Sequence, residues 1–354
     1  MNGGKNRYIE LLRFVFCIFI LLHHSGFVSA DGKGLLPSGG VIADAFFMLT
    51  GYFACVHLNN KCEKIQKPLI YSVKYTYKKL IKVLPYSSFG ILIIYMLELI
   101  QVGFKLSIRE YIHRLYYMIV ELGFLSMTGL IKTDLLNFRN APLWYLSAIL
   151  LSLPLVMYIS IKTNLIFKRV IVWFIPLCIQ MWMVERYGGA LPWMDSWVIV
   201  KSGAVRGFSS IMMGFGIYYG SSFLKQNKER VNRTFRIMLT TVEIFLFIIL
   251  FYNMNVGVNR YNEILTLYIV YFMLMLSLSE LTYTCRLDSP IFDFLGKISL
   301  PVYCIHWGIY RWMAGYFGYI DFWPSVIITL TLCIITSVML MTITDRFRKR
   351  KYAE

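Results

Sequence analysis

The sequence is poor in charged residues, and this scarcity excludes an ordinary soluble domain. Asp, Glu, Lys and Arg make up 16% of the 354 residues, whereas 58% are hydrophobic and the mean hydropathy is +0.60. This balance, together with long apolar runs, is typical of a polytopic helical membrane protein. The sequence therefore predicts an all-α membrane fold that forms a single domain over residues 1–354.

The cysteines lack the paired spacing that disulfide frameworks and zinc sites use. Most of the seven stand inside apolar segments, at Cys17, Cys55, Cys62, Cys178, Cys285, Cys304 and Cys333. We therefore expect neither a disulfide framework nor a metal site.

Acidic residues are scarce relative to basic ones, with 19 Asp and Glu against 36 Lys and Arg and a net charge of +17. The basic residues stand in short connections between apolar segments, where the positive-inside rule accounts for them. We therefore expect contact with membrane lipids and not with nucleic acid.

Eleven apolar segments follow one another, and charge placement decides which of them cross the membrane. If all crossed, the basic residues between 225 and 236 would lie outside the cell. The segment at 111–130, with His113, Arg114 and Glu121, is the least suited to face lipid. We therefore predict about ten transmembrane helices plus one re-entrant or interfacial helix, with both termini cytoplasmic. The segments are 8–28, 39–58, 84–104, 111–130, 143–161, 168–185, 203–223, 235–254, 261–279, 295–317 and 322–343.

Extramembrane domains, long linkers and low-complexity tracts are also missing. The longest polar stretch, residues 57–81, predicts an amphipathic helix on the cytoplasmic surface of the membrane. No small-residue cleavage site follows the first apolar segment, so we interpret that segment as a retained span.

The first apolar segment, Tyr8 to Phe27, carries ionisable residues that are costly in a membrane. Arg13 and His24 are eleven residues apart, which is three helical turns or about 16 Å along one face. One stripe therefore holds Glu10, Arg13, Cys17, Leu21 and His24, and we expect it to face the protein interior. The alternative is an interfacial Glu10–Arg13 ion pair with ordinary interfacial histidines at the other end.

Five short patterns occur in order along the chain. They are Arg13 and His24 with ten residues between them, VIADAFFMLTGYF, YKKLIKVLP, APLWYLSAIL and LGKISLPVYCIHW. In this combination, the chain resembles the acyltransferase 3 family of integral membrane O-acyltransferases from residue 8 to about residue 310. It departs from the family pattern with Lys at positions 79 and 82 in place of Arg, Thr50 in place of Ser, and Leu300-Pro301.

The resemblance implies an enzyme of the cell membrane that transfers an acyl group, usually acetyl from cytoplasmic acetyl-CoA. The acceptor would be a hydroxyl of a cell-surface or lipid-linked glycan. No carbohydrate-binding or SGNH-type domain is present, so acceptor choice would lie in the outer loops and helix ends. The oligomeric state is not predicted.

The candidate catalytic residues are His24, Arg13, Asp44 and Glu10. The His24 imidazole suits a general base, or a nucleophile that accepts the acyl group itself. The Arg13 guanidinium suits the phosphate or carbonyl oxygens of the donor. The Asp44 carboxylate either orients an imidazole or stabilises a helix N-terminus.

Two groups of residues are candidates for ligand binding. Arg13, Lys78, Lys79 and Lys82 would hold acetyl-CoA, although the lysines also fit a topology signal or contact with anionic lipid. The expected substrate-binding residues are Trp144, Tyr145, Arg206, Tyr303 and His306. Each also has a structural interpretation: an aromatic belt for Trp144 and Tyr145, a helix anchor for Arg206, and interhelical polar contacts for Tyr303 and His306.

A membrane transporter of a small polar substrate such as an amino acid is the alternative function, because carriers also bury charge pairs near the membrane midplane. Consumption of acetyl-CoA would distinguish the enzyme from the carrier.

Overall fold

The computed structural model describes residues 6–27, 34–61, 65–129, 140–318 and 322–351, and these residues fold into eleven α-helices. The helices are α1 (Arg7–His24), α2 (Ile42–Asn59), α3 (Pro68–Gln101), α4 (Ile108–Leu122), α5 (Trp144–Ile166), α6 (Val172–Tyr187), α7 (Ser202–Gln226), α8 (Arg233–Val256), α9 (Tyr261–Leu278), α10 (Pro290–Phe317) and α11 (Phe322–Lys351). A short antiparallel hairpin, β1 (Ser196–Trp197) with β2 (Val200–Lys201), joins α6 to α7. The shorter turns are η1 (Ser25–Phe27), η2 (Gly39–Val41), η3 (Ala141–Leu143), η4 (Phe167–Ile171), η5 (Lys228–Arg230) and η6 (Thr284–Arg286).

Seven of the described helices, α2, α3, α5, α6, α8, α9 and α11, are long and apolar enough to cross a membrane. This confirms an all-α polytopic membrane protein. The helices α1, α7 and α10 fall outside that set, and they carry the ionisable residues Arg13, Arg206 and His306. Ten spans and two cytoplasmic termini therefore remain predictions.

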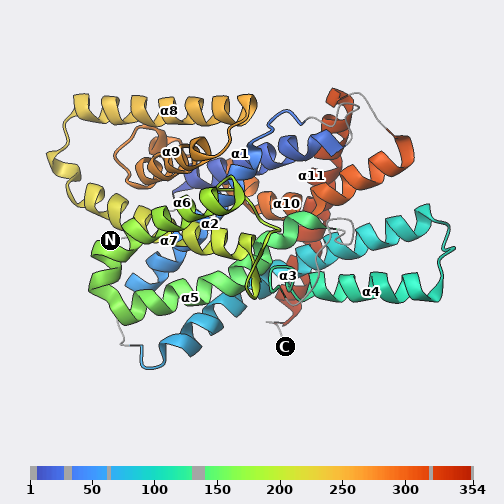
Figure 1. The fold of residues 1–354 in the computed structure, drawn as a ribbon. Coiled ribbons are helices and arrows are strands. Elements are labelled where there is room, and N and C mark those ends of the chain that lie inside the picture. The colour runs from blue at the N-terminus through green and yellow to red at the C-terminus, as the bar shows by residue number, and fades with distance from the viewer. Residues whose placement is uncertain (1–5, 28–33, 62–64, 130–139, 319–321, 352–354) are drawn as a thin grey trace.

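The most apolar helices lie at the perimeter of the bundle. Only 11% of the most apolar stretch of α8 is buried in the protein, against 67% for α2. Figure 1 shows α8 along one edge of the molecule. Lipid can cover such a helix, whereas the more polar α1 and α10 need protein partners.

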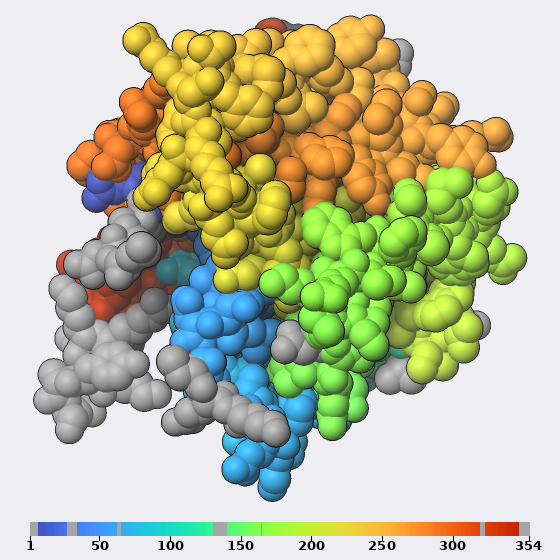
Figure 2. Space-filling model, turned by 90° about the vertical axis from the view of Figure 1, so that its left-hand side faces the viewer, coloured from blue at the N-terminus to red at the C-terminus, as the bar shows by residue number. Residues whose placement is uncertain are grey.

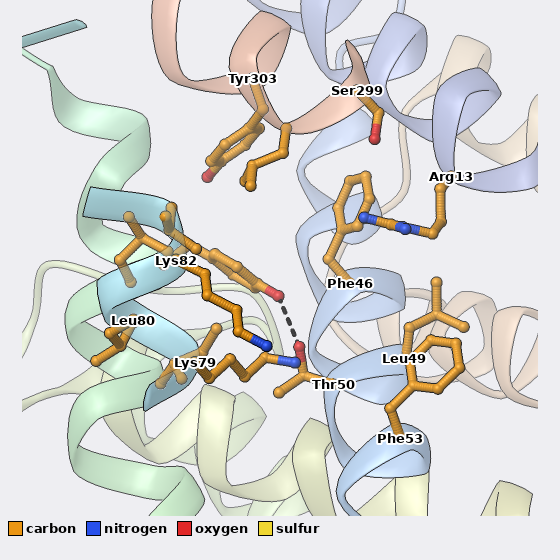
Figure 3. Close-up of a pocket in the computed structure, with 15 residues that line it drawn as sticks. Arg13, Phe46, Leu49, Thr50, Phe53, Lys79, Leu80, Lys82, Ser299 and Tyr303 are labelled. Carbon is orange, nitrogen blue, oxygen red and sulfur yellow. Dashed lines mark hydrogen bonds between the residues drawn. The ribbon is translucent and has the colours of Figure 1, made fainter. Parts of the chain in front are cut away.

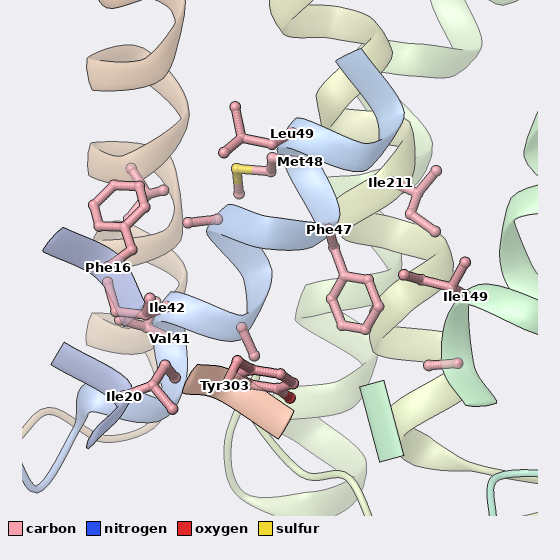
Figure 4. Close-up of a cluster of buried hydrophobic side chains, with 14 of the residues drawn as sticks. Phe16, Ile20, Val41, Ile42, Phe47, Met48, Leu49, Ile149, Ile211 and Tyr303 are labelled. Atoms are coloured by element: carbon pink, nitrogen blue, oxygen red, sulfur yellow. The ribbon is translucent and has the colours of Figure 1, made fainter. Parts of the chain in front are cut away.

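Two glycines bring the backbones of α2 and α7 into contact at the centre of the bundle. A Cβ atom on Gly51 would lie 2.0 Å from the carbonyl oxygen of Ile211, and one on Gly214 would lie 2.0 Å from that of Met48. Only glycine fits at either position, as in other closely packed membrane helices. Figure 4 shows the buried Phe47 side chain on the side of α2 that faces Ile211 of α7, with Met48 and Leu49 on the opposite side.

The polar stretch before the third apolar segment is not a separate surface helix. Instead, α3 runs without a break for 34 residues and includes both the lysines and Pro85. The prediction of one amphipathic helix over residues 57–81 was therefore wrong, because residues 57–59 end α2 and residues 68–81 begin α3. The helix continues on both sides of Pro85, so this proline does not end α3.

The helix α4 is short and amphipathic, and it lies beside the end of α3 (Figure 1). Arg114 of α4 forms a 3.1 Å ion pair with Glu98 of α3, and Ser107 and Glu110 form a capping box. With 15 residues, α4 is not among the helices that could span a membrane. This agrees with a re-entrant or interfacial segment.

The bundle has two chemically distinct ends. At one, the connections between helices are rich in Lys and Arg, as at Lys168, Arg169 and Lys228, and Arg7 forms 2.8 Å ion pairs with Asp288 and Asp293. We call this the basic end; Figure 2 looks onto it, with the α2–α3, α5–α6 and α7–α8 connections in blue, green and yellow. We call the opposite end, where α1 finishes at His24, the histidine end.

Candidate active site

Two histidines meet at the histidine end, one from the last turn of α1 and one from the middle of α10. Nδ1 of His24 lies 2.9 Å from Nε2 of His306, and the two rings stack with centroids 5.1 Å apart. The helices are tied together below them, where the Cys17 thiol donates to the carbonyl oxygen of Ser299. The fold thus joins two imidazoles that are 282 residues apart in sequence.

The backbone of α10 assigns the tautomers of this pair. Nδ1 of His306 lies 2.8 Å from the carbonyl oxygen of Tyr303, which can only accept a hydrogen bond. A neutral His306 therefore carries its proton on Nδ1 and accepts at Nε2, so Nδ1 of His24 must be the donor. Nε2 of neutral His24 is left with a lone pair, as a base or a nucleophile requires.

A cavity of about 100 Å³ adjoins His24. The rings of Trp307 and His24 pack edge to face, with their centroids 5.0 Å apart. The rings of Trp144 and Trp193 are stacked, with their centroids 5.6 Å apart. Indole and imidazole rings therefore form much of its wall. The lining residues are Ile20, His23, His24, Gly40, Ala43, Ala141, Pro142, Trp144, Trp193, Arg206, Tyr303 and Trp307.

A second cavity, of about 310 Å³, lies toward the basic end and is lined by cations. Arg13 of α1 and Lys79 and Lys82 of α3 border the same space (Figure 3). The hydroxyls of Thr50 and Tyr145 meet there, 3.1 Å apart. Such a mixture of cationic, hydroxyl and apolar groups suits a ligand with anionic groups and an apolar arm.

Tyr303 lines both cavities and so stands between them. Its ring lies 6.2 Å from Phe46 and 6.0 Å from Tyr145, and its hydroxyl donates to the carbonyl oxygen of Pro142. The same residue supplies the carbonyl that orients His306. One turn of α10 therefore connects the two cavities to the histidine pair.

The predicted stripe of α1 is present, and its two ends face different cavities. Arg13 lines the basic cavity and His24 the cavity at the histidine end. Nη1 of Arg13 also lies 2.7 Å from the Glu10 carboxylate, which is 13% exposed. Arg13 thus forms the ion pair with Glu10 that one interpretation predicted, and it borders an internal cavity as the other interpretation predicted.

The Asp44 carboxylate pairs with Arg206 and does not orient His24. Nε of Arg206 lies 3.1 and 3.0 Å from the two Asp44 oxygens, and Ser210 donates to the same carboxylate at 2.7 Å. Arg206 also donates to the carbonyl oxygens of Leu191 and Gly40. This buried cluster ties the start of α2 to the start of α7, and the hydrogen-bond partner of the His24 ring in the structure is His306.

Most of the remaining candidates border one of the two cavities, and Lys78 borders neither. Trp144 and Arg206 border the histidine end, and Tyr145 borders the basic cavity. Lys78 is exposed on α3 and lines neither cavity. The described residues contain no group of three or more His, Cys, Asp or Glu placed to hold a metal ion.

Sequence reasoning missed Trp193 and Trp307, which form walls of the cavity beside His24. Trp193 belongs to the connection between α6 and α7, where an aromatic residue is also expected from the membrane interface alone. Trp307 directly follows His306, and this adjacency was the available signal.

Comparison with protein families identifies the chain. The model of an acyltransferase domain, that of the acyltransferase 3 family, matches residues 6–344. The chain belongs to the acyltransferase 3 family. The comparisons found no match among curated proteins and none among solved structures. Membership of the acyltransferase 3 family makes the protein a membrane acyltransferase and gives no support to the transporter alternative.

Proposed function

We propose that this protein is a multi-pass O-acetyltransferase of the cell membrane. It moves an acetyl group from cytoplasmic acetyl-CoA to a hydroxyl of a cell-surface or lipid-linked glycan. The observation that carries the proposal is the hydrogen-bond chain from the Tyr303 carbonyl through His306 to His24. This chain leaves Nε2 of His24 unprotonated beside a cavity, with a cationic cavity on the other side of Tyr303.

The basic cavity is the proposed donor site. Its volume of about 310 Å³ is at the lower end for small-molecule sites, so it suits the extended thioester arm better than the whole nucleotide. Arg13, Lys79 and Lys82 would hold phosphate or carbonyl oxygens of the donor. Lys78 would act only at a distance, by attracting the anionic donor to the basic end.

His24 is the proposed reacting residue. Its Nε2 either takes the proton of the acceptor hydroxyl or attacks the thioester carbonyl and carries the acetyl group. In both routes His24 gains positive charge, and the acceptor nitrogen of His306 stabilises it through the Nδ1 hydrogen bond.

The cavity beside His24 is the proposed acceptor site. Trp144, Trp193 and Trp307 supply an aromatic wall for a sugar ring next to the reacting nitrogen, with Trp193 stacked on Trp144 and the Arg206 guanidinium over the Trp144 ring. A volume of about 100 Å³ admits one hydroxyl-bearing edge of a sugar and not a whole oligosaccharide. The rest of the glycan would extend beyond the histidine end.

Hydrolysis of radiolabelled acetyl-CoA and retention of label by the purified protein test the proposal. We expect the wild-type protein to release CoA or to retain acetyl, and we expect His24→Ala to do neither. Arg13→Ala should need a higher donor concentration for the same rate. If the wild-type protein neither turns over nor binds acetyl-CoA, even with a crude glycan fraction added, the proposal fails.

A further inference from the structure

His23, the neighbour of His24, also borders the cavity at the histidine end, and its tautomer is fixed as well. Its Nδ1 lies 2.7 Å from the carbonyl oxygen of Leu36, so Nδ1 donates and Nε2 keeps a lone pair. The described part of the chain gives this Nε2 no hydrogen-bond partner. The ring centroids of His23 and His24 are 5.0 Å apart. The cavity therefore holds two neighbouring imidazoles, each with an unprotonated Nε2.

Two glycines hold the His23 ring in place. A Cβ atom on Gly39 would lie 2.8 Å from Cβ of His23 and 3.1 Å from its ring atom Cγ, so glycine lets this turn pack closely against the His23 side chain. At Gly40 the corresponding atom would lie 3.7 Å from Nε2 of His23, and the absence of a side chain leaves that nitrogen uncovered. The local structure thus orients His23, which lines the cavity, and the glycine at position 40 puts no side chain beside its basic nitrogen.

We propose that His23 is a second catalytic residue, the base that takes the proton of the acceptor hydroxyl. The inference rests on the proposed function and commits to the route in which His24 carries the acetyl group. Once Nε2 of His24 is acetylated, it has no lone pair for the acceptor. Another base must then act within the same cavity, and Nε2 of His23 has the orientation and accessibility for it.

The two steps balance as follows. Nε2 of His24 attacks the thioester carbonyl, the carbon–sulfur bond breaks, CoA leaves as the thiolate, and the Nδ1 proton of His24 passes to His306. The hydroxyl oxygen of the acceptor then attacks the acetyl carbon while its proton moves to Nε2 of His23. The carbon–nitrogen bond breaks, its electron pair returns to His24, and His306 returns the proton. His23 releases its proton to solvent, and the thiolate takes up an equivalent one.

Deacetylation by water tests this role without knowledge of the acceptor, because water stands in for the hydroxyl. The full-length protein is labelled with radioactive acetyl-CoA, freed of donor, and followed as the label is lost. The variants are His23→Asn, whose amide can still donate to Leu36, and His23→Gln, whose amide oxygen can still accept a hydrogen bond. His113→Gln, on α4, is the matched control.

We expect both His23 variants to capture acetyl within about threefold of the wild-type rate and to lose it about 100-fold more slowly. The His113 variant should behave as wild type in both steps. Hydroxylamine needs no base to attack an acyl-imidazole, so it should discharge all the labelled proteins equally fast.

Three results would overturn the role of His23. The first is that the His23 variants lose label at the wild-type rate. The second is that the rates of acetyl capture and acetyl loss fall by the same factor, as expected for a structural residue. The third is that the wild-type protein turns over without ever retaining acetyl. The last result would leave His24 as the base of a direct transfer and the proposed function intact. Absence of both capture and turnover in the wild-type protein would instead refute the proposed function.

Discussion

The two cavities differ in charge and in their contents although they share the Tyr303 side chain. The basic cavity has three cationic side chains and about three times the volume of its neighbour, 310 Å³ against 100 Å³. Among the described residues that line it, the smaller cavity has two imidazoles, and the Arg206 guanidinium there is already paired with Asp44. Under the proposed function, binding of an anionic donor and activation of an acceptor are separate tasks on opposite sides of Tyr303.

Replacement of His24 should give the largest effect. It should lower turnover and leave donor binding in the basic cavity unchanged. We expect His24→Ala to lower turnover about 10⁴-fold, because it removes the reacting nitrogen. Binding of acetyl-CoA, measured by isothermal titration calorimetry, should stay within about twofold of wild type. A matching loss of donor binding would show that the two cavities do not act separately.

Breaking the Asp44–Arg206 pair should damage the fold at the histidine end. Arg206→Met leaves a buried carboxylate unpaired, and Arg206 is only 3% exposed. We expect a loss of about 3–5 kcal/mol in the free energy of unfolding. Thermal unfolding in detergent would report this loss as a lower transition temperature.

The double variant Asp44→Asn/Arg206→Met is the control for that experiment, since it removes both charges. It should recover most of the lost stability. A stable single variant that has lost only affinity for the acceptor would instead favour Arg206 as a substrate-binding residue.

Changes at His306 test whether the orientation of His24 matters. We expect His306→Phe, which removes the acceptor for Nδ1 of His24, to lower kcat about 100-fold with little change in KM for acetyl-CoA. His306→Gln places an amide oxygen near the same position and should recover about tenfold of that loss. Equal losses in both variants would mean that His306 contributes packing and no orientation.

Truncation of Arg13 should act on the opposite cavity. Arg13→Ala is expected to raise KM for acetyl-CoA about 10- to 30-fold, equivalent to about 1.4–2 kcal/mol, with a smaller change in kcat. Steady-state kinetics over a range of donor concentrations would measure both. If kcat falls and KM does not, Arg13 acts on the reacting group and the assignment of the donor cavity is wrong.

Helix periodicity predicted the part of this site that lies within one helix. The spacing of Arg13 and His24 placed both on one face of α1, and the structure has both facing internal cavities. The same reasoning placed Tyr303 and His306 one turn apart on a late helix, as observed. Such calculations need only the rise and rotation per residue.

Contacts between helices could not be predicted from the sequence. Nothing in the chain indicated that His24 would meet His306 across 282 residues, or that Asp44 would pair with Arg206 and leave His24 to another partner. The close crossing at Gly51 also needs Gly214 on a distant helix. Pairings of this kind depend on the packing of the whole bundle, which a single sequence does not display.

Replacement of the lysines of α3 should give the smallest effect. The sequence predicted the same role for all three, whereas the structure places only two of them at the basic cavity. Lys79 and Lys82 line the basic cavity, whereas Lys78 does not, although Lys78 and Lys82 are both exposed. We expect Lys82→Met to raise KM for acetyl-CoA about three- to fivefold at low salt, because a partly solvated cation–phosphate contact is worth about 1 kcal/mol. Lys78→Met should change KM less than twofold, and 0.5 M NaCl should reduce the difference between the variants. Equal effects of the two substitutions would mean that the lysines attract the donor only as a diffuse charge, and that the cavity does not select among them.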